Sequence, residues 1–145
     1  MGEDVEERVS DRPLVVVLVD DNPNDLDLLQ VLVSTVLPGA EIHLAENGFV
    51  GLYTIGRHQA DVVITDIMMP NMDGLEMIRT LFEQPGMKPA ALIAASSLSA
   101  EKIAKLGRLP PGIPLLPKPL EMTDVVEALR AQLGDDVVET QVELG

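Results

Sequence analysis

The sequence contains no cysteine and no tryptophan, and its aromatic side chains are limited to one tyrosine and two phenylalanines. Without cysteine the chain can form neither disulfide bonds nor thiolate metal sites, which also excludes a thiol redox role. Nevertheless 46% of the 145 residues are hydrophobic. A chain of this length is long enough to bury a core, so we expect a single folded domain whose interior is aliphatic.

Basic residues are also scarce, with 10 Lys and Arg against 24 Asp and Glu, which gives a formal net charge of -14. A surface of this sign repels phosphate backbones, so we expect no nucleic-acid partner, and it attracts divalent cations and basic protein surfaces. No apolar run reaches membrane-spanning length, and the acidic start Met1–Asp4 differs from the basic start of a signal peptide. We therefore expect no membrane contact and a cytoplasmic location.

Segments with strand and helix character alternate along the chain. We expect strands at 14–19, 41–45, 62–65, 91–95 and 113–116, and helices from Pro23 to the Pro38–Gly39 stop and at 48–59, 73–83, 100–106 and 121–133. This alternation predicts an α/β fold, a doubly wound five-stranded parallel sheet with helices on both faces.

The predicted body of the domain covers residues 13–133, between an acidic N-terminal extension at 1–12 and an acidic C-terminal tail at 134–145. Residues 138–144 alternate apolar and polar side chains, and we expect a disordered tail there rather than an added strand. In the helix at 73–83 we expect Leu75, Ile78 and Phe82 to face the core.

Polar side chains follow four of the expected strands at the point where each strand ends. Asp66 alone could be explained as the cap of the next helix. Parallel strands, however, bring their carboxyl ends to one edge of the sheet, so several such side chains should converge there. They are Asp20 and Asp21 after the first strand, Asp66 after the third, Ser96 after the fourth and Lys118 after the fifth.

The converging groups favour phosphoryl-transfer chemistry. Three carboxylates repel one another unless a cation joins them, and oxygen ligands with room for water suit Mg²⁺. The ammonium of Lys118 can attract a phosphoryl oxygen, and the hydroxyl of Ser96 can donate a hydrogen bond. Together these groups could transfer a phosphoryl group to Asp66. His43 and His58 lie outside the cluster and are interpreted as ordinary surface or helix residues.

The chain resembles the receiver domains of two-component response regulators. The resemblance rests on the acidic pair Asp20–Asp21, the run Asp66–Gly74, Ser96, and Lys118–Pro119, and it covers residues 13–133. It implies a flavodoxin-like sheet of order 2-1-3-4-5.

The resemblance also implies specific roles. Asp66 would be the phosphorylated residue. Asp20, Asp21 and Asp66, with the backbone carbonyl of Met68, would hold Mg²⁺.

In the same way, Lys118 would contact the phosphoryl group and its peptide bond to Pro119 would be cis. Ser96 would move toward the phosphoryl group after transfer. The family usually carries a switching aromatic residue three positions before the lysine, and here that position is Leu115. We therefore expect the coupled aromatic rotation to be absent.

The leading interpretation is a stand-alone receiver, a signalling protein rather than an enzyme, which would accept its phosphoryl group from a histidine kinase or a histidine phosphotransfer protein. It would contact a downstream target through the face between the helices at 100–106 and 121–133. The main alternative is a degenerate receiver that binds partners without phosphorylation. A Mg²⁺-dependent phosphohydrolase of the haloacid dehalogenase type and a flavin or nucleotide binder fit the motifs less well, because neither the acid spacing after the first strand nor a glycine-rich loop is present.

Overall fold

The computed structural model describes residues 12–69, 74–106 and 109–135. Its centre is one parallel sheet with the strand order β2-β1-β3-β4-β5, which confirms the predicted α/β fold and flavodoxin-like order. The strands are β1 Val15–Val19, β2 Glu41–Ala45, β3 Val62–Asp66, β4 Ala91–Ser96 and β5 Leu115–Pro117.

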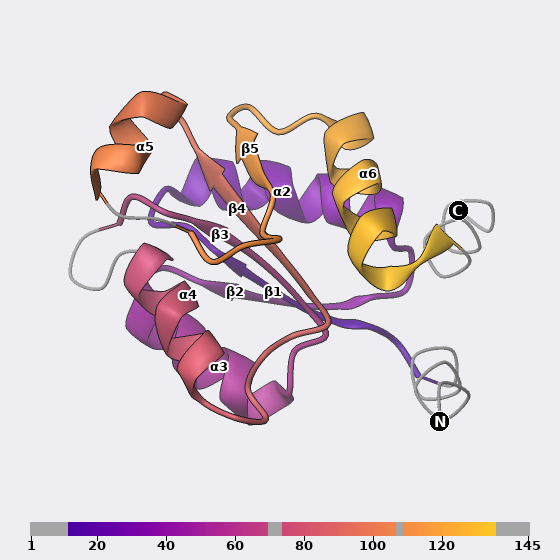
Figure 1. Cartoon of the computed structure of the whole chain (residues 1–145). Coiled ribbons are helices and arrows are strands. Elements are labelled where there is room, and N and C mark those ends of the chain that lie inside the picture. Colours follow the sequence, from indigo (N-terminus) through magenta and orange to yellow (C-terminus); the bar gives the residue numbers. More distant parts are fainter. Residues whose placement is uncertain (1–11, 70–73, 107–108, 136–145) are drawn as a thin grey trace.

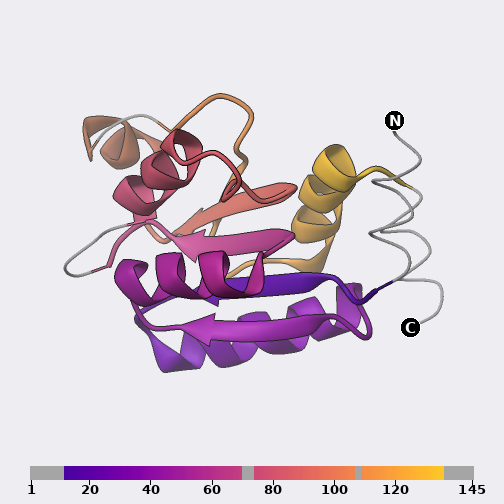
Figure 2. The same cartoon turned by 90° about the horizontal axis from the view of Figure 1, so that it is seen from below.

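Helices cover both faces of this sheet, as predicted. They are α2 Pro23–Val36, α3 Gly48–His58, α4 Gly74–Glu83, α5 Ala100–Leu106 and α6 Met122–Leu133. In Figure 1, α2 and α6 lie on one side of the strands and α3 and α4 on the other. Figure 2 shows the same layers from below, with β2 at one border of the sheet.

Each face of the sheet buries its own aliphatic core, because successive strand residues point to opposite faces. On the α2 and α6 face, Val16, Leu18 and Ile64 pack against Leu29 and Leu129. On the α3 and α4 face the core includes Val17, Val19, Val63, Met77 and Ile78. The three central strands are therefore apolar on both faces, which explains their continuous hydrophobic runs.

The turn leading from β1 into α2 follows its sequence signals. The side-chain oxygen of Asn22 accepts hydrogen bonds from the backbone N–H groups of Asn24 and Asp25, and Pro23 occupies the first helical position. This cap fixes where the helix starts relative to the end of β1. The residues just before it, Asp20 and Asp21, are thereby held at the edge of the sheet.

Two local predictions differ from the structure. The last strand begins later than expected, at Leu115, and includes Pro117, which β5 tolerates because it is an edge strand. The prediction that Phe82 faces the core is wrong. Phe82 is 37% exposed and lies under the ammonium of Lys88, while Leu81 takes the buried position on α4.

The predicted extensions lie almost wholly outside the described residues, including the alternating segment at 138–144. Arg12, the last residue of the predicted N-terminal extension, makes an ion pair with Asp61 in the body of the domain. Among the helices of the described ranges, none has the length and apolar character needed to cross a membrane.

Candidate functional site

The parallel register brings the predicted polar residues to one edge of the sheet. The backbone N–H of Asp20 donates to the carbonyl of Ala45, continuing the pairing of β1 with β2. Asp66 and Ser96 are the final residues of β3 and β4. The backbone N–H of Lys118 donates to the carbonyl of Ser96 at 3.0 Å. Four strands thus deliver their side chains to the same place.

Lys118 lies at the centre of the cluster. Its Nζ donates hydrogen bonds to Asp20 Oδ2 at 2.6 Å, Asp25 Oδ2 at 2.9 Å and Asp66 Oδ2 at 3.0 Å. Burial of the ammonium lowers its pKa, but the hydrogen bonds to Asp20, Asp25 and Asp66 outweigh this and raise the pKa above the usual range. Lys118 is therefore a permanent positive charge. Its peptide bond to Pro119 is cis, the state that the resemblance implied.

Asp66 is held at both carboxylate oxygens. Oδ1 accepts the backbone N–H of Met68 at 3.0 Å, and Oδ2 accepts Lys118 Nζ. Only 7% of the residue is exposed. Desolvation raises the pKa of Asp66 above its ordinary value and the charge of Asp20 adds to this, although the hydrogen bonds from Met68 and Lys118 act in the opposite direction.

An acidic pocket forms where the carboxylates meet. One oxygen from each of Asp20, Asp21 and Asp66 lies within 4.8 Å of the other two. Asp20 is fully buried and Asp21 is exposed, so the pocket opens to water on one side. Three hard oxygen donors with access to water fit the ligand preference of Mg²⁺, which keeps part of its hydration shell.

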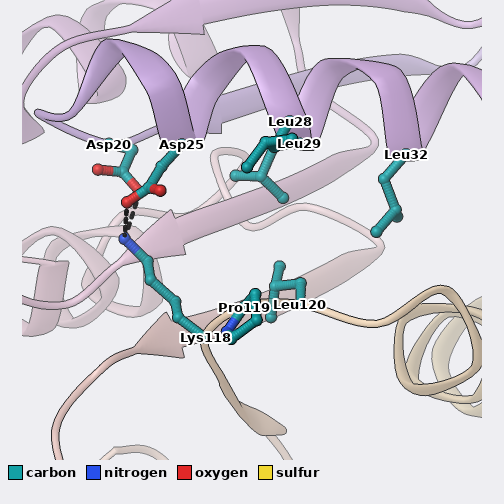
Figure 3. A pocket seen from close by; sticks show the side chains of 8 residues that line it. All are labelled: Asp20, Asp25, Leu28, Leu29, Leu32, Lys118, Pro119 and Leu120. Carbon is teal, nitrogen blue, oxygen red and sulfur yellow. Dashed lines mark hydrogen bonds and ion pairs between the residues drawn. The ribbon is translucent and has the colours of Figure 1, made fainter.

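A cavity of about 220 Å³ adjoins the cluster, between α2 and the segment after β5. Asp20, Asp25 and Lys118 lie at one end, and apolar side chains line the rest (Figure 3). The other lining residues are Leu28, Leu29, Leu32, Pro119 and Leu120.

The remaining predicted residues take different positions. Ser96 is buried, and its Oγ accepts the backbone N–H of Leu98 at 2.9 Å. Met68 is 44% exposed. Leu115 is half-buried and packs against the core on the α3 and α4 face. Its aliphatic side chain has no ring that could change position.

Two contributors were missed from the sequence. The sequence pattern indicates for Asp25 only a place near the positive end of α2, but its carboxylate pairs with Lys118. Its position one turn after Asn22 on α2 was the available signal. Gly74 ends the run Asp66–Gly74, and the motif by itself does not say why a glycine stands there. A Cβ there would lie 2.2 Å from the carbonyl oxygen of Asp66 and 2.6 Å from Ile67 Cα. A glycine is thus required for α4 to start against the end of β3.

Residues 16–130 match the response regulator receiver domain family. The chain is 34% identical over 129 residues to the probable transcriptional regulatory protein TcrX of Mycobacterium tuberculosis, covering 87% of this chain and 52% of TcrX. It is 44% identical over 80 residues to an uncharacterized response regulatory protein of Vibrio cholerae, covering 54% of this chain and 31% of that protein. The chain thus spans between about a third and a half of the length of these curated relatives.

The fold has solved counterparts. The receiver domain of the sensor histidine kinase PA1611 from Pseudomonas aeruginosa PAO1, crystallised with a magnesium ion coordinated in its active-site cleft, superposes with a TM-score of 0.70. The match covers 84% of this chain and 98% of that domain at 19% identity, so it bears on the fold alone. The family match, the curated relatives and the fold agree, and this chain belongs to the response regulator receiver domain family, the signalling domain of two-component systems.

Proposed function

We propose that this receiver domain accepts a phosphoryl group on Asp66. One observation carries the proposal: Asp66 ends the central strand β3 with its oxygens bonded to Lys118 and to the Met68 N–H, beside the carboxylates of Asp20 and Asp21. This combination supplies a nucleophile, a fixed cation and a cation-binding pocket within one small volume.

We infer that Asp20, Asp21 and Asp66, with the backbone carbonyl of Met68, hold Mg²⁺. When bound, the ion supplies charge neutralisation for the phosphoryl oxygens. The fit rests on three carboxylates that lie close together. The single ammonium of Lys118 is shared among several acids, so it neutralises their charge only in part. Asp25 adds a further carboxylate to Lys118 and so helps to fix the position of the ammonium.

The reaction would be a direct displacement at phosphorus. A carboxylate oxygen of Asp66 attacks the phosphorus of a phosphohistidine, and the P–N bond breaks. Its electron pair leaves with the imidazole nitrogen, which takes up a proton. Lys118 would attract a phosphoryl oxygen, and the hydroxyl of Ser96 would donate a hydrogen bond to another. The domain would thus assist its own modification without acting as an enzyme on other substrates.

The donor that suits this chemistry is a histidine kinase or a histidine phosphotransfer protein. Output would proceed through protein contacts on the face between α5 and α6. Because Leu115 replaces the aromatic residue, the signal would depend on Ser96. This hydroxyl would leave the Leu98 N–H and move toward the phosphoryl group, shifting the start of α5.

The experiment is incubation with phosphoramidate and Mg²⁺, followed by intact-mass measurement. We expect the mass increase of one phosphoryl group in the natural chain and none in Asp66→Asn. Asp25→Asn is the matched control, because it also removes a carboxylate bonded to Lys118 but leaves the acceptor. Equal labelling of Asp66→Asn and the natural chain would reject Asp66 as the acceptor.

A second candidate is a phosphorylation-independent interaction module, which Leu115 favours because it removes the usual relay. The same experiment separates the two functions. No mass gain in the natural chain, with Mg²⁺ and donor both in excess, would support the module. A gain confined to chains that retain Asp66 would support the acceptor.

A further inference from the structure

The two histidines of the chain belong to different elements and lie against each other. His43 is on β2, an edge strand of the sheet, and His58 is the last residue of α3. Their ring centroids are 3.8 Å apart with an interplanar angle of 18°. The chain has only these two histidines among its 145 residues, so their meeting is not a by-product of a histidine-rich surface.

A carboxylate completes this group. Glu41 precedes His43 by two residues on β2, so both side chains point to the same face of the strand, the face covered by α3. Glu41 Oε2 lies 2.7 Å from His43 Nε2. One ligand atom each from Glu41, His43 and His58 lies within 4.8 Å of the other two. We call these three residues the edge cluster.

We propose that the edge cluster is a second cation site, one that binds a late first-row divalent metal ion of the Zn²⁺, Cu²⁺ and Ni²⁺ class. Two imidazole nitrogens and one carboxylate oxygen are the ligands these ions prefer, and three protein ligands leave further positions for water. The Glu41 side chain is 52% exposed and that of His43 is 26% exposed, so an ion can enter directly from solvent.

The charge of the molecule favours the same inference. A net charge of -14 raises the local concentration of cations. A hydrogen bond to Glu41 requires only one histidine, His43. The second imidazole instead provides a nitrogen ligand from another element. A bound ion would therefore link the edge strand β2 to the end of α3.

The edge cluster differs in ligand chemistry from the acidic pocket, so the two sites can be separated by the choice of ion. The pocket of Asp20, Asp21 and Asp66 offers oxygen ligands only, which suit Mg²⁺, whereas imidazole discriminates against Mg²⁺ in favour of Zn²⁺. The proposal is independent of the phosphoryl-acceptor function, and either one can fail without affecting the other.

The test is calorimetric titration of the full chain with Zn²⁺ in a buffer containing excess Mg²⁺, which occupies the acidic pocket. Nitrogen-detected NMR of the imidazole rings is recorded in parallel, and each ring belongs to the proposed site. We expect one Zn²⁺ to bind and both ring signals to shift. We expect His58→Gln and His43→Gln each to weaken binding at least tenfold, and Glu41→Gln to weaken it less.

Glu46→Gln is the matched control for charge, because Glu46 is an exposed acid three residues after His43. It should bind Zn²⁺ as the natural chain does. Thermal unfolding checks that the variants fold, and Zn²⁺ should raise the Tm of the natural chain more than that of His58→Gln. The proposal is overturned if Zn²⁺ fails to bind in excess Mg²⁺, if the ring signals do not move, or if His58→Gln binds as tightly as the natural chain.

Discussion

The central strand β3 has an aspartate at each end, and the two are held in different ways. Asp61, immediately before β3, accepts a two-pronged pair of hydrogen bonds from Arg12 at 2.7 and 2.8 Å, and a third from the backbone N–H of Val15 at 2.8 Å. Asp66, the last residue of β3, accepts one hydrogen bond from Lys118 and one from the Met68 N–H.

The difference lies in how many acids share each cation. Arg12 serves Asp61 with both of its terminal nitrogens, whereas Lys118 is divided among Asp20, Asp25 and Asp66. A planar guanidinium locks one carboxylate in place, and a single ammonium cannot neutralise several. The ion pair at the Asp61 end therefore has a structural role. The Asp66 end keeps uncompensated negative charge, which would favour the proposed binding of Mg²⁺.

The largest difference between the two ends of β3 is expected when Lys118 or Arg12 is replaced and the rate of Asp66 phosphorylation is measured. Lys118→Met should slow phosphorylation of Asp66 by on the order of a hundredfold, about 3 kcal/mol, because a fixed charge near the reacting oxygens is lost. Arg12→Met should leave that rate within about a factor of two. Rates from intact-mass time courses test this. Similar slowing in both variants would mean that the two ends are not functionally distinct.

The close approach at the Asp66 end should tolerate no added side-chain atom. Gly74→Ala should lower the free energy of unfolding by about 2 kcal/mol, because its Cβ would overlap the backbone of Asp66 and Ile67. Urea denaturation measures the change. Gly56→Ala is the control: it is also helical, its Cβ would meet only the flexible end of Met87 at 3.4 Å, and it should be neutral or slightly stabilising. Equal stability of the Gly74 variant and the natural chain would contradict the prediction.

Asp61→Asn should weaken the structural end. It replaces a charged two-pronged contact by a neutral one, and we expect a loss of about 1–2 kcal/mol, limited because the Arg12 side chain is 41% exposed. Denaturant unfolding gives the value. Phosphorylation of Asp66 should proceed at the natural rate, and a large fall in that rate in a folded Asp61→Asn protein would show that the amino end of β3 also controls the site.

Asp66→Asn should increase the free energy of unfolding, whereas Asp61→Asn should decrease it. Because burial raises the folded-state pKa of Asp66, the folded protein holds this proton at pH values where the unfolded chain, with a pKa of about 3.9, has released it. Ionisation of Asp66 therefore costs stability as the pH rises.

In metal-free buffer at about pH 7, we expect Asp66→Asn to be more stable than the natural chain, and the difference in stability to shrink as the pH falls toward the unfolded-state pKa of about 3.9. Unfolding curves across this pH range provide the measurement. A natural chain that is the more stable of the two at neutral pH would show that Lys118 compensates the buried charge fully.

Most of the fold could be predicted because it depends on local patterns. Each signal lies within a few residues of the element that it determines. Examples are the apolar runs of β1 and β3, the cap at Asn22 and the glycine and proline residues that end the helices. The failures came where packing decides. Phe82 fitted the period of α4 but lies at the exposed border of its apolar face beside Lys88, and β5 starts at Leu115 because pairing with β4 begins there.

By itself, the sequence determined which chemical groups end the strands: Asp20 and Asp21, Asp66, Ser96 and Lys118. The parallel sheet makes their convergence a consequence of strand direction. Only the tertiary structure decided how charge is shared among them, that Asp25 joins Lys118, and that Glu41, His43 and His58 meet at the border of the sheet. These contacts require separate elements to be placed within a few ångströms of one another. The periodicity of a single segment does not encode such a placement.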